Sequence, residues 1–223
     1  MAPPGYVIVE RDILMLKPRN RTKRAMVHDD YRWENNTIMY NDDDLRAAFD
    51  NYPTEYVPST VGKSAALDRL SAAMKAFTML AFVRTTNESM TAVRFTGTPN
   101  SQCYATVGFH PGKQLYMNLA VDRLGCWTPA TLQHELGHVA GLFHEQSRPD
   151  RDVYLNVTNP ELYTGQSKRY TVSTINSRST LYDFRSVMHY PLEFFNAIPT
   201  EQGYARLGQQ NLNENEIGWA SSL

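Results

Sequence analysis

The segment that decides the fold of this chain is residues 134–144, which read HELGHVAGLFH. His134 and His138 stand four positions apart, so on a helix both rings lie on one face and can reach one metal ion. Gly141 favours a left-handed backbone that ends the helix, and the returning chain brings His144 to the same point. Three imidazole ligands around tetrahedral zinc leave one position for water. The spacing therefore predicts a zinc site with an open coordination position.

Glu135 directly follows the first predicted ligand and is expected beside the metal rather than on it. A carboxylate in that position can act as general base on a zinc-activated water, which is the nucleophile of zinc-dependent peptide hydrolysis. The residues therefore predict a zinc endopeptidase. A non-catalytic binding module on the same scaffold is the alternative, and the complete set of histidines with Glu135 argues against it. A structural zinc protein is a further alternative, but its closed site would need a fourth strong ligand.

Composition limits the classes of partner. The 223 residues are enough for one domain with a full core, which a cleft can divide into two lobes. The formal net charge of -1 gives no electrostatic reason to expect nucleic acid or an anionic membrane. No apolar run approaches the roughly 18 residues of a membrane span. The opening MAPPGY lacks the basic and apolar parts of a signal peptide, so we expect either a cytosolic protein or a leader outside this sequence.

Local patterns predict the elements around the motif. Thr128 and Pro129 are typical of a helix start, and this helix carries the ligands. The run of asparagine and aspartate at 41–44 is typical of a loop. Apolar spacing predicts an earlier helix over 67–77, and one late helix is expected around 213–219. Strands are predicted around residues 38–40, 81–84, 91–96 and 114–119.

The motif continues as EQSRPDRD over residues 145–152, and residues 186–190 read SVMHY. Both strings resemble those of the astacin family of metzincin zinc peptidases, and the likeness extends over about residues 9–220. The resemblance implies an α+β, zincin/metzincin-like domain with two lobes. The N-terminal lobe would hold a twisted mixed β-sheet and two long helices, and the C-terminal lobe would be largely irregular with one late helix. The cleft is expected between about 25–144 and 145–223.

The resemblance also assigns roles to single residues. Met188 would form a hydrophobic floor under one zinc ion per chain. Tyr190 would be a fifth, switchable zinc ligand that swings away to hydrogen-bond the transition state, and Glu145 would pair with the mature N-terminus. Protein or peptide substrates would bind extended along an edge strand by β-augmentation. That strand is expected at Tyr116, Met117, Asn118 and Leu119.

An N-terminal propeptide is the next implication of the resemblance. Residues 9–13, VERDI, resemble the family's propeptide segment, in which Asp12 would cap the zinc of a latent enzyme. Residues 1–24 are therefore expected to be a propeptide remnant, and 25–223 the catalytic domain. The string RTKR fits a basic site for a processing protease, which would cut between Arg24 and Ala25.

The two cysteines, Cys103 and Cys126, can be either buried free thiols or a disulfide on sequence grounds alone. They fall where the resembling family places a disulfide. With the basic processing site, this predicts a secreted protein. We also expect a monomer and, from the net charge and the lack of an apolar span, no binding to nucleic acid or membrane. The physiological substrate is not predicted by any motif.

Overall fold

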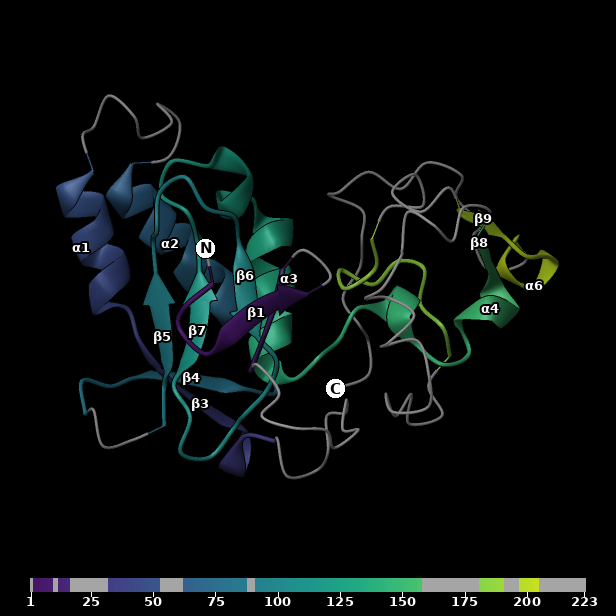
Figure 1. Ribbon diagram of the computed structural model, residues 1–223, viewed down its shortest axis with the longest axis horizontal. Coiled ribbons are helices and arrows are strands. Elements are labelled where there is room, and N and C mark those ends of the chain that lie inside the picture. Colours follow the sequence, from purple (N-terminus) through teal and green to yellow (C-terminus); the bar gives the residue numbers. More distant parts are fainter. Residues whose placement is uncertain are drawn as a thin grey trace. The chain divides into compact units, whose positions relative to one another are not determined.

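The computed structural model describes residues 2–9, 12–16, 32–52, 62–87, 91–157, 181–190 and 197–204. Of these residues, the ones up to Leu142 form one compact unit and those from Phe143 form a second. The first unit contains the β-sheet and the longer helices, as Figure 1 shows.

A seven-stranded mixed sheet is the frame of the first unit, with the order β1-β2-β6-β7-β5-β3-β4. β1 and β2 form an antiparallel hairpin, β2 lies parallel to β6, and β6 is antiparallel to β7. β5 is parallel to both β7 and β3, and β3 is parallel to β4. The strands are β1 (Tyr6–Val9), β2 (Ile13–Leu16), β3 (Thr37–Asn41), β4 (Ala81–Arg84), β5 (Val93–Thr96), β6 (Tyr104–Thr106) and β7 (Leu115–Asn118).

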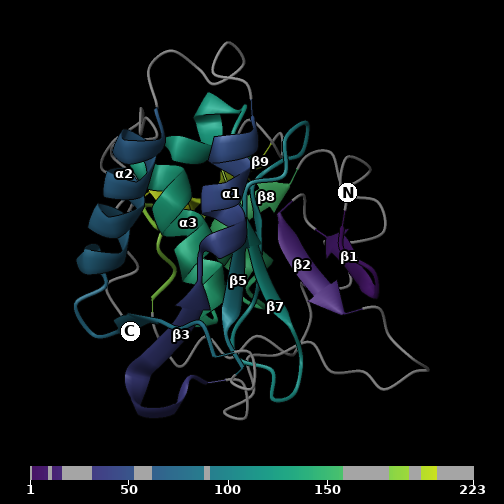
Figure 2. The ribbon, with the colours of Figure 1, turned by 90° about the vertical axis from the view of Figure 1, so that its left-hand side faces the viewer.

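Among its described residues, the first unit also has three helices and two short 3-10 turns. They are α1 (Asp43–Asn51), α2 (Lys63–Ala76), α3 (Pro129–Ala140), η2 (Glu34–Asn36) and η3 (Leu124–Trp127). α2 packs against α3, which also packs against β6, while α1 packs against β5. Figure 2 shows the β1–β2 hairpin and α2 at opposite sides of this unit.

The core of the unit follows from the side-chain periods of its elements. In β5, Val93 and Phe95 are buried while Arg94 is only partly covered, as alternation along a strand requires. In α3, Leu132, Leu136 and Val139 recur at helical spacing and are fully buried. α3, which carries the predicted ligands and is called the zinc helix below, is therefore held by one apolar face, and its other face is left for polar side chains.

The sequence-based prediction is wrong at residues 41–44, because α1 begins at Asp43 instead of a loop continuing there. Asp43 and Asp44 lie in the first turn, where acidic side chains interact favourably with the helix dipole. Leu45 and Phe49 then give this helix a buried face. The two long helices that were expected are α2 and α3, and α1 is a third, shorter one.

The second unit has short elements among its described residues. They are η4 (Glu145–Ser147), α4 (Arg151–Tyr154), β8 (Leu155–Val157), β9 (Ala197–Pro199) and α6 (Glu201–Tyr204). β8 and β9 pair antiparallel, and Leu155, Tyr182 and Phe184 form a small buried cluster. The late helix predicted around 213–219 lies outside the described residues.

Within the described ranges, no helix combines the length and the apolar character that crossing a bilayer requires.

Candidate zinc site

The helix that carries the predicted ligands begins at a strong N-terminal cap. The Thr128 hydroxyl accepts the backbone N–H of Thr131 at 3.1 Å, and Pro129 occupies the first helical position. Proline is favoured there because its missing N–H would have no partner in the helix. Both features confirm the predicted start of α3.

Gly141 ends α3 in a left-handed conformation, with φ 110° and ψ 10°. Its N–H returns to the His138 carbonyl at 2.8 Å, and the Leu142 N–H returns to the Gly137 carbonyl at 2.9 Å. A side chain at position 141 would be strained in this conformation, whereas glycine adopts it freely. The predicted role of Gly141 in reversing the chain after the second histidine is confirmed.

The reversal also fixes the protonation of one ligand. His138 Nδ1 lies 2.7 Å from the Leu142 carbonyl oxygen. A carbonyl can only accept, so Nδ1 is the nitrogen that carries the proton. In the neutral ring Nε2 then keeps its lone pair, and a carbonyl partner of this kind is what orients histidine ligands in metal sites.

Four side chains offer ligand atoms to one point. The donor atoms of Asp12, His134, His138 and His144 all lie within 4.8 Å of one another. Around tetrahedral zinc with bonds of about 2.1 Å, donors lie about 3.4 Å apart. The 3.3 Å from His134 Nε2 to Asp12 Oδ2 matches that spacing, and His138 Nε2 lies 3.9 Å from Asp12 Oδ1. Three imidazoles and a carboxylate at these distances fit zinc in both donor type and number.

Glu135 is buried, with 2% of its surface exposed. Its Oε2 atom has no hydrogen-bond partner among the described residues. Burial raises the pKa of this carboxyl well above its ordinary range, and the negative charge of Asp12 raises it further. An unsatisfied buried carboxylate oxygen is costly unless a function needs it, so this atom fits a proton acceptor for water.

Asp12 reaches the site from the N-terminal hairpin. It directly precedes β2, and its backbone carbonyl accepts the N–H of Ala105 in β6 at 2.8 Å. Ile13 and Leu14 next to it are each only 1% exposed. The sheet therefore holds the backbone that directly follows the carboxylate facing His134.

In the second unit, the Met-turn, residues 186–190 around Met188, lies next to the segment that follows the third histidine. The Met188 carbonyl accepts the Glu145 N–H at 2.9 Å, and the Tyr190 N–H donates to Gln146 Oε1 at 3.0 Å. The rings of His144 and Tyr190 lie 4.3 Å apart between centroids. Met188 is 1% exposed.

His189 has a structural role within the same turn. Its Nδ1 lies 2.5 Å from the Tyr190 carbonyl, which makes Nδ1 the donor, and its Nε2 lies 2.8 Å from the Tyr182 hydroxyl. Burial is the main cause that lowers the pKa of His189 to about 4. The ring is therefore neutral at pH 7, accepts the Tyr182 proton and holds the turn in place.

Glu145, the expected partner of the mature N-terminus, is engaged within its own unit. Its Oε1 accepts Arg148 at 2.9 Å and the Asp183 N–H at 2.9 Å. Burial raises the pKa of Glu145, although those two bonds oppose the rise. The predicted cleavage site, Arg24 and Ala25, lies outside the described residues, so the pairing with a new terminus stays a prediction.

The predicted position of the substrate edge strand, Tyr116 to Leu119, is wrong. β7 contains Tyr116, Met117 and Asn118, and it is paired on one side with β5 and on the other with β6. Leu119 follows the strand, and its N–H bonds the Thr96 carbonyl. Because both sides of β7 are paired, no peptide can add to it; the strand that the hairpin covers is β6.

Cys103 and Cys126 form a disulfide with a Cα–Cα distance of 5.6 Å. Cys103 directly precedes β6, and Cys126 lies in η3 just before α3. The bond therefore links the start of the hairpin-covered strand to the start of the zinc helix.

Two residues that support α3 and the hairpin were not identified from the sequence. Trp33 donates its indole N–H to the Val139 carbonyl in the last turn of α3 at 2.8 Å. Tyr6 packs with Leu14 and Tyr104 under the hairpin. Their partners stand far away in the sequence, so no local pattern could have identified either one.

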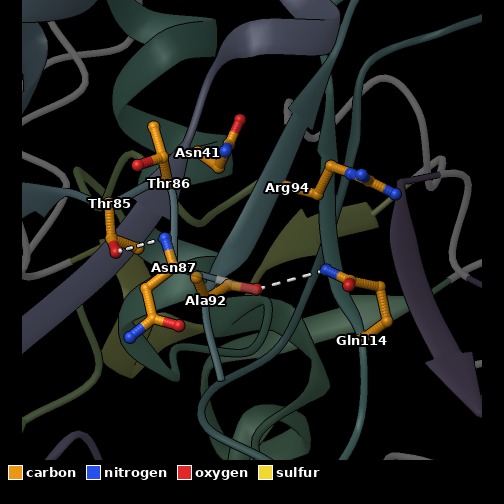
Figure 3. Close-up of a pocket in the computed structure, with 7 residues that line it drawn as sticks. All are labelled: Asn41, Thr85, Thr86, Asn87, Ala92, Arg94 and Gln114. Carbon is orange, nitrogen blue, oxygen red and sulfur yellow. Dashed lines mark hydrogen bonds between the residues drawn. The ribbon is translucent and has the colours of Figure 1, made fainter. Parts of the chain in front are cut away.

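A polar cavity of about 340 Å³ lies elsewhere on the first unit (Figure 3). Its Arg94 is already paired with Asp44 at 3.0 Å, and Gln114 donates to the Ala92 carbonyl at 3.3 Å. None of the predicted metal ligands lines it, so it is separate from the candidate zinc site. Its lining residues are Asn41, Thr85, Thr86, Asn87, Ala92, Arg94 and Gln114.

A metzincin-type zinc site on an α+β fold is defined by three imidazoles, by a buried glutamate that lies between two of them in the sequence, and by a left-handed glycine that ends the helix carrying those two. The model of the astacin peptidase family matches residues 26–222. The chain belongs to the astacin family, as its motifs predicted. Family membership and the donor set together identify the metal as zinc.

Relatives span most of the chain. "Zinc metalloproteinase nas-4" of Caenorhabditis elegans is 30% identical over 228 residues, which is 92% of this chain and 63% of that protein. "High choriolytic enzyme 1" of Oryzias latipes is 34% identical over 145 residues, 63% of this chain and 51% of that protein. The chain therefore spans between half and two thirds of the length of these relatives.

A solved structure confirms the predicted fold class. High choriolytic enzyme 1, described as a hatching enzyme zinc-protease from Oryzias latipes (medaka fish), matches with a TM-score of 0.56. The match covers 83% of this chain and 88% of that chain at 24% identity. At this identity the likeness concerns the fold alone.

Proposed function

We propose that this chain is a zinc-dependent endopeptidase that hydrolyses peptide bonds in proteins or peptides. The observation that carries the proposal is Glu135, a buried carboxylate whose Oε2 has no hydrogen-bond partner among the described residues. It stands between two histidines of a four-ligand group. A structural zinc site has no use for such an atom, whereas a hydrolytic site needs it to accept a proton.

The residues divide the chemistry among themselves. His134, His138 and His144 would hold the zinc, which would lower the pKa of a bound water to about 7 and supply a positive charge for the scissile carbonyl. Glu135 accepts the proton of the attacking water and passes it to the leaving amine nitrogen. The Tyr190 hydroxyl hydrogen-bonds the negative charge that develops on the carbonyl oxygen, a contact that typically lowers a barrier by about 2.7–4 kcal/mol.

The chain with residues 1–24 attached is the latent form of this enzyme. A carboxylate oxygen is a competent zinc ligand, so Asp12 occupies the position that water needs. β2 also lies along β6 and uses the main-chain groups that an extended substrate would bond. Cleavage after Arg24 by a processing protease removes both obstacles, and the new terminus at Ala25 pairs with Glu145. Substrate then adds to β6.

A secreted, monomeric enzyme is the form we propose. The Cys103–Cys126 disulfide supports an oxidising compartment, because such bonds are rare in the cytosol. The fit of residues 21–24 to a basic processing site supports passage through the secretory pathway.

The test is Glu135→Gln in a chain cut after Arg24. Zinc content by atomic absorption should stay near one ion per chain, because Glu135 is not a ligand, while turnover of a peptide library falls at least about a hundredfold. Glu201→Gln, which changes an exposed glutamate of α6, is the control and should leave both unchanged. A Glu135→Gln enzyme with most of its activity would sink the proposal. A cut wild-type chain that binds zinc but cleaves no peptide would favour the binding-module alternative.

A further inference from the structure

The last turn of α3 receives hydrogen bonds from two remote parts of the chain. The final carbonyls of a helix have no partner within it. The Val139 carbonyl accepts the indole N–H of Trp33 at 2.8 Å, and this bond is buried. The His138 carbonyl accepts the Gly108 N–H at 2.9 Å in addition to that of Gly141.

The two donors support each other. Trp33 is 7% exposed, and its ring packs on that of Phe109 with centroids 5.1 Å apart. Phe109 follows Gly108 in the connection between β6 and β7. Trp33 precedes η2 and β3. The end of the zinc helix is therefore held between two segments that no local sequence pattern relates to it.

The turn that these contacts hold is the one that orients His138. Gly141 and Leu142 follow Val139 within three residues, and the Leu142 carbonyl accepts the proton of His138 Nδ1 at 2.7 Å. If the last turn frays, this carbonyl moves away and the ring can rotate or change tautomer. Partners of this kind on a histidine ligand typically change metal affinity by 10–100-fold when lost.

We propose that Trp33 is a positioning residue for the zinc site: its indole N–H holds the last turn of α3 so that the Leu142 carbonyl keeps His138 ready to bind metal. The expected effect on zinc binding rests on the proposed function. The hold of Trp33 on the last turn of α3 does not, because it can be measured without metal.

The experiment compares two tryptophans. Trp33→Phe removes the N–H and keeps an aromatic ring beside Phe109. Trp127→Phe is the matched control, because Trp127 is also buried and donates its indole N–H to a carbonyl, that of Ala120, at 3.1 Å. Trp127 precedes the N-terminal end of α3, away from Leu142. Each is measured in the full chain by amide hydrogen exchange without metal and by zinc titration against a chelator.

Trp33→Phe should speed exchange of the Gly141 and Leu142 amides at least about tenfold and weaken zinc binding by about 10–100-fold. Trp127→Phe should change neither the exchange of these two amides nor the zinc affinity, even if it lowers overall stability as much as Trp33→Phe does. Equal effects of the two variants on zinc affinity, or unchanged exchange at residues 141–142 in Trp33→Phe, would overturn the proposal.

A second variant covers the case in which Trp33→Phe does not fold. Replacing Trp33 by β-(3-benzothienyl)alanine exchanges the N–H for sulfur in a ring of nearly the same shape. The same two measurements then decide, and unchanged exchange again rejects the role. Failure of the unmodified chain to bind zinc would refute the proposed function, while the exchange measurement would still test the positioning by Trp33.

Discussion

The two flanks of the seven-stranded sheet are built in opposite ways. At one flank, β1 and β2 cover β6 with apolar side chains: Ile13 and Leu14 are 1% exposed, and Tyr6 and Tyr104 are buried beside them. At the other, β4 has an exposed Val83, and its Arg84 forms ion pairs with Asp42 and Asp43 at the start of α1.

The contrast shows that the β6 flank depends on being covered by another strand, whereas the β4 flank does not. A short strand bordered by charge is a common protection for a sheet edge. The hairpin flank has no such protection on β6, where apolar residues and unpaired main-chain groups would remain without β2. This is also the flank that places Asp12 among the zinc ligands. In the proposed latent form, the covered flank is thus the one along which substrate would bind after cleavage.

The strongest way to test this contrast is Asp12→Ala in the uncut chain. The carboxylate that faces His134 is lost, so water regains access to the metal and the uncut chain should show peptidase activity, although β2 still covers β6 and should keep that activity below that of the cut chain. Activity is measured on a fluorogenic peptide before any cleavage. Asp68→Ala, which removes an exposed carboxylate of α2, should leave the uncut chain inactive. If Asp12→Ala stays as inactive as wild type, the aspartate switch is wrong.

A second effect, on stability rather than on activity, is expected from the apolar contacts of the two flanks. Leu14→Ala deletes a buried side chain and should cost about 2–5 kcal/mol in the docking of the hairpin. Val83→Ala, at 42% exposure on β4, should change stability by less than about 0.5 kcal/mol. The measurement is amide exchange at Ala105, whose N–H bonds the Asp12 carbonyl. Equal exchange rates of Ala105 in the two variants would show that the apolar side chains of the two flanks do not differ in importance.

The smallest effect concerns the ionic flank and its pH dependence. Burial alone would raise the pKa of Asp42, but hydrogen bonds from Arg46 and Arg84 outweigh it and hold that pKa below its ordinary value. A lowered folded-state pKa gives stability that is present above the unfolded value, near 3.9, and is lost as pH falls through the folded value. Both arginines are partly exposed, so Asp42→Asn should cost only about 1 kcal/mol at pH 7.

Urea unfolding of wild type and Asp42→Asn at pH 7 and pH 2 checks this expectation. The difference in free energy of unfolding between the two proteins should be smaller at pH 2, because protonation of Asp42 in the wild type weakens its bonds to the arginines. A difference that is the same at both pH values would mean that Asp42 acts through packing rather than charge.

Sequence alone predicted the parts of the site that depend on local spacing. The Thr128 cap, the helical placement of His134 and His138 and the left-handed turn at Gly141 are all encoded within 14 residues. The start of α1 was missed because three aspartates resemble a loop, although two of them favour the first turn of a helix.

Long-range pairing could not be predicted in this way. Whether β7 is an edge depends on which strands lie beside it, and the β1–β2 hairpin, far away in sequence, decides that for β6. The bond from Trp33 to Val139 spans 106 residues. Neither the strand order nor this hydrogen bond produces a periodic pattern in the sequence. The sequence therefore predicted what single residues do better than which distant segments they contact.

The hairpin and the zinc helix belong to one covalent chain, and this affects how much of the time Asp12 occupies the metal site. While residues 16 and 32 are connected, the carboxylate meets its histidine partners at an effective concentration on the order of millimolar. One cut between those residues turns the same contacts into an encounter of two molecules, whose occupancy falls with dilution. Blocking of the metal by Asp12 would then depend on how much released peptide surrounds the enzyme, so activity would develop faster in dilute than in concentrated protein.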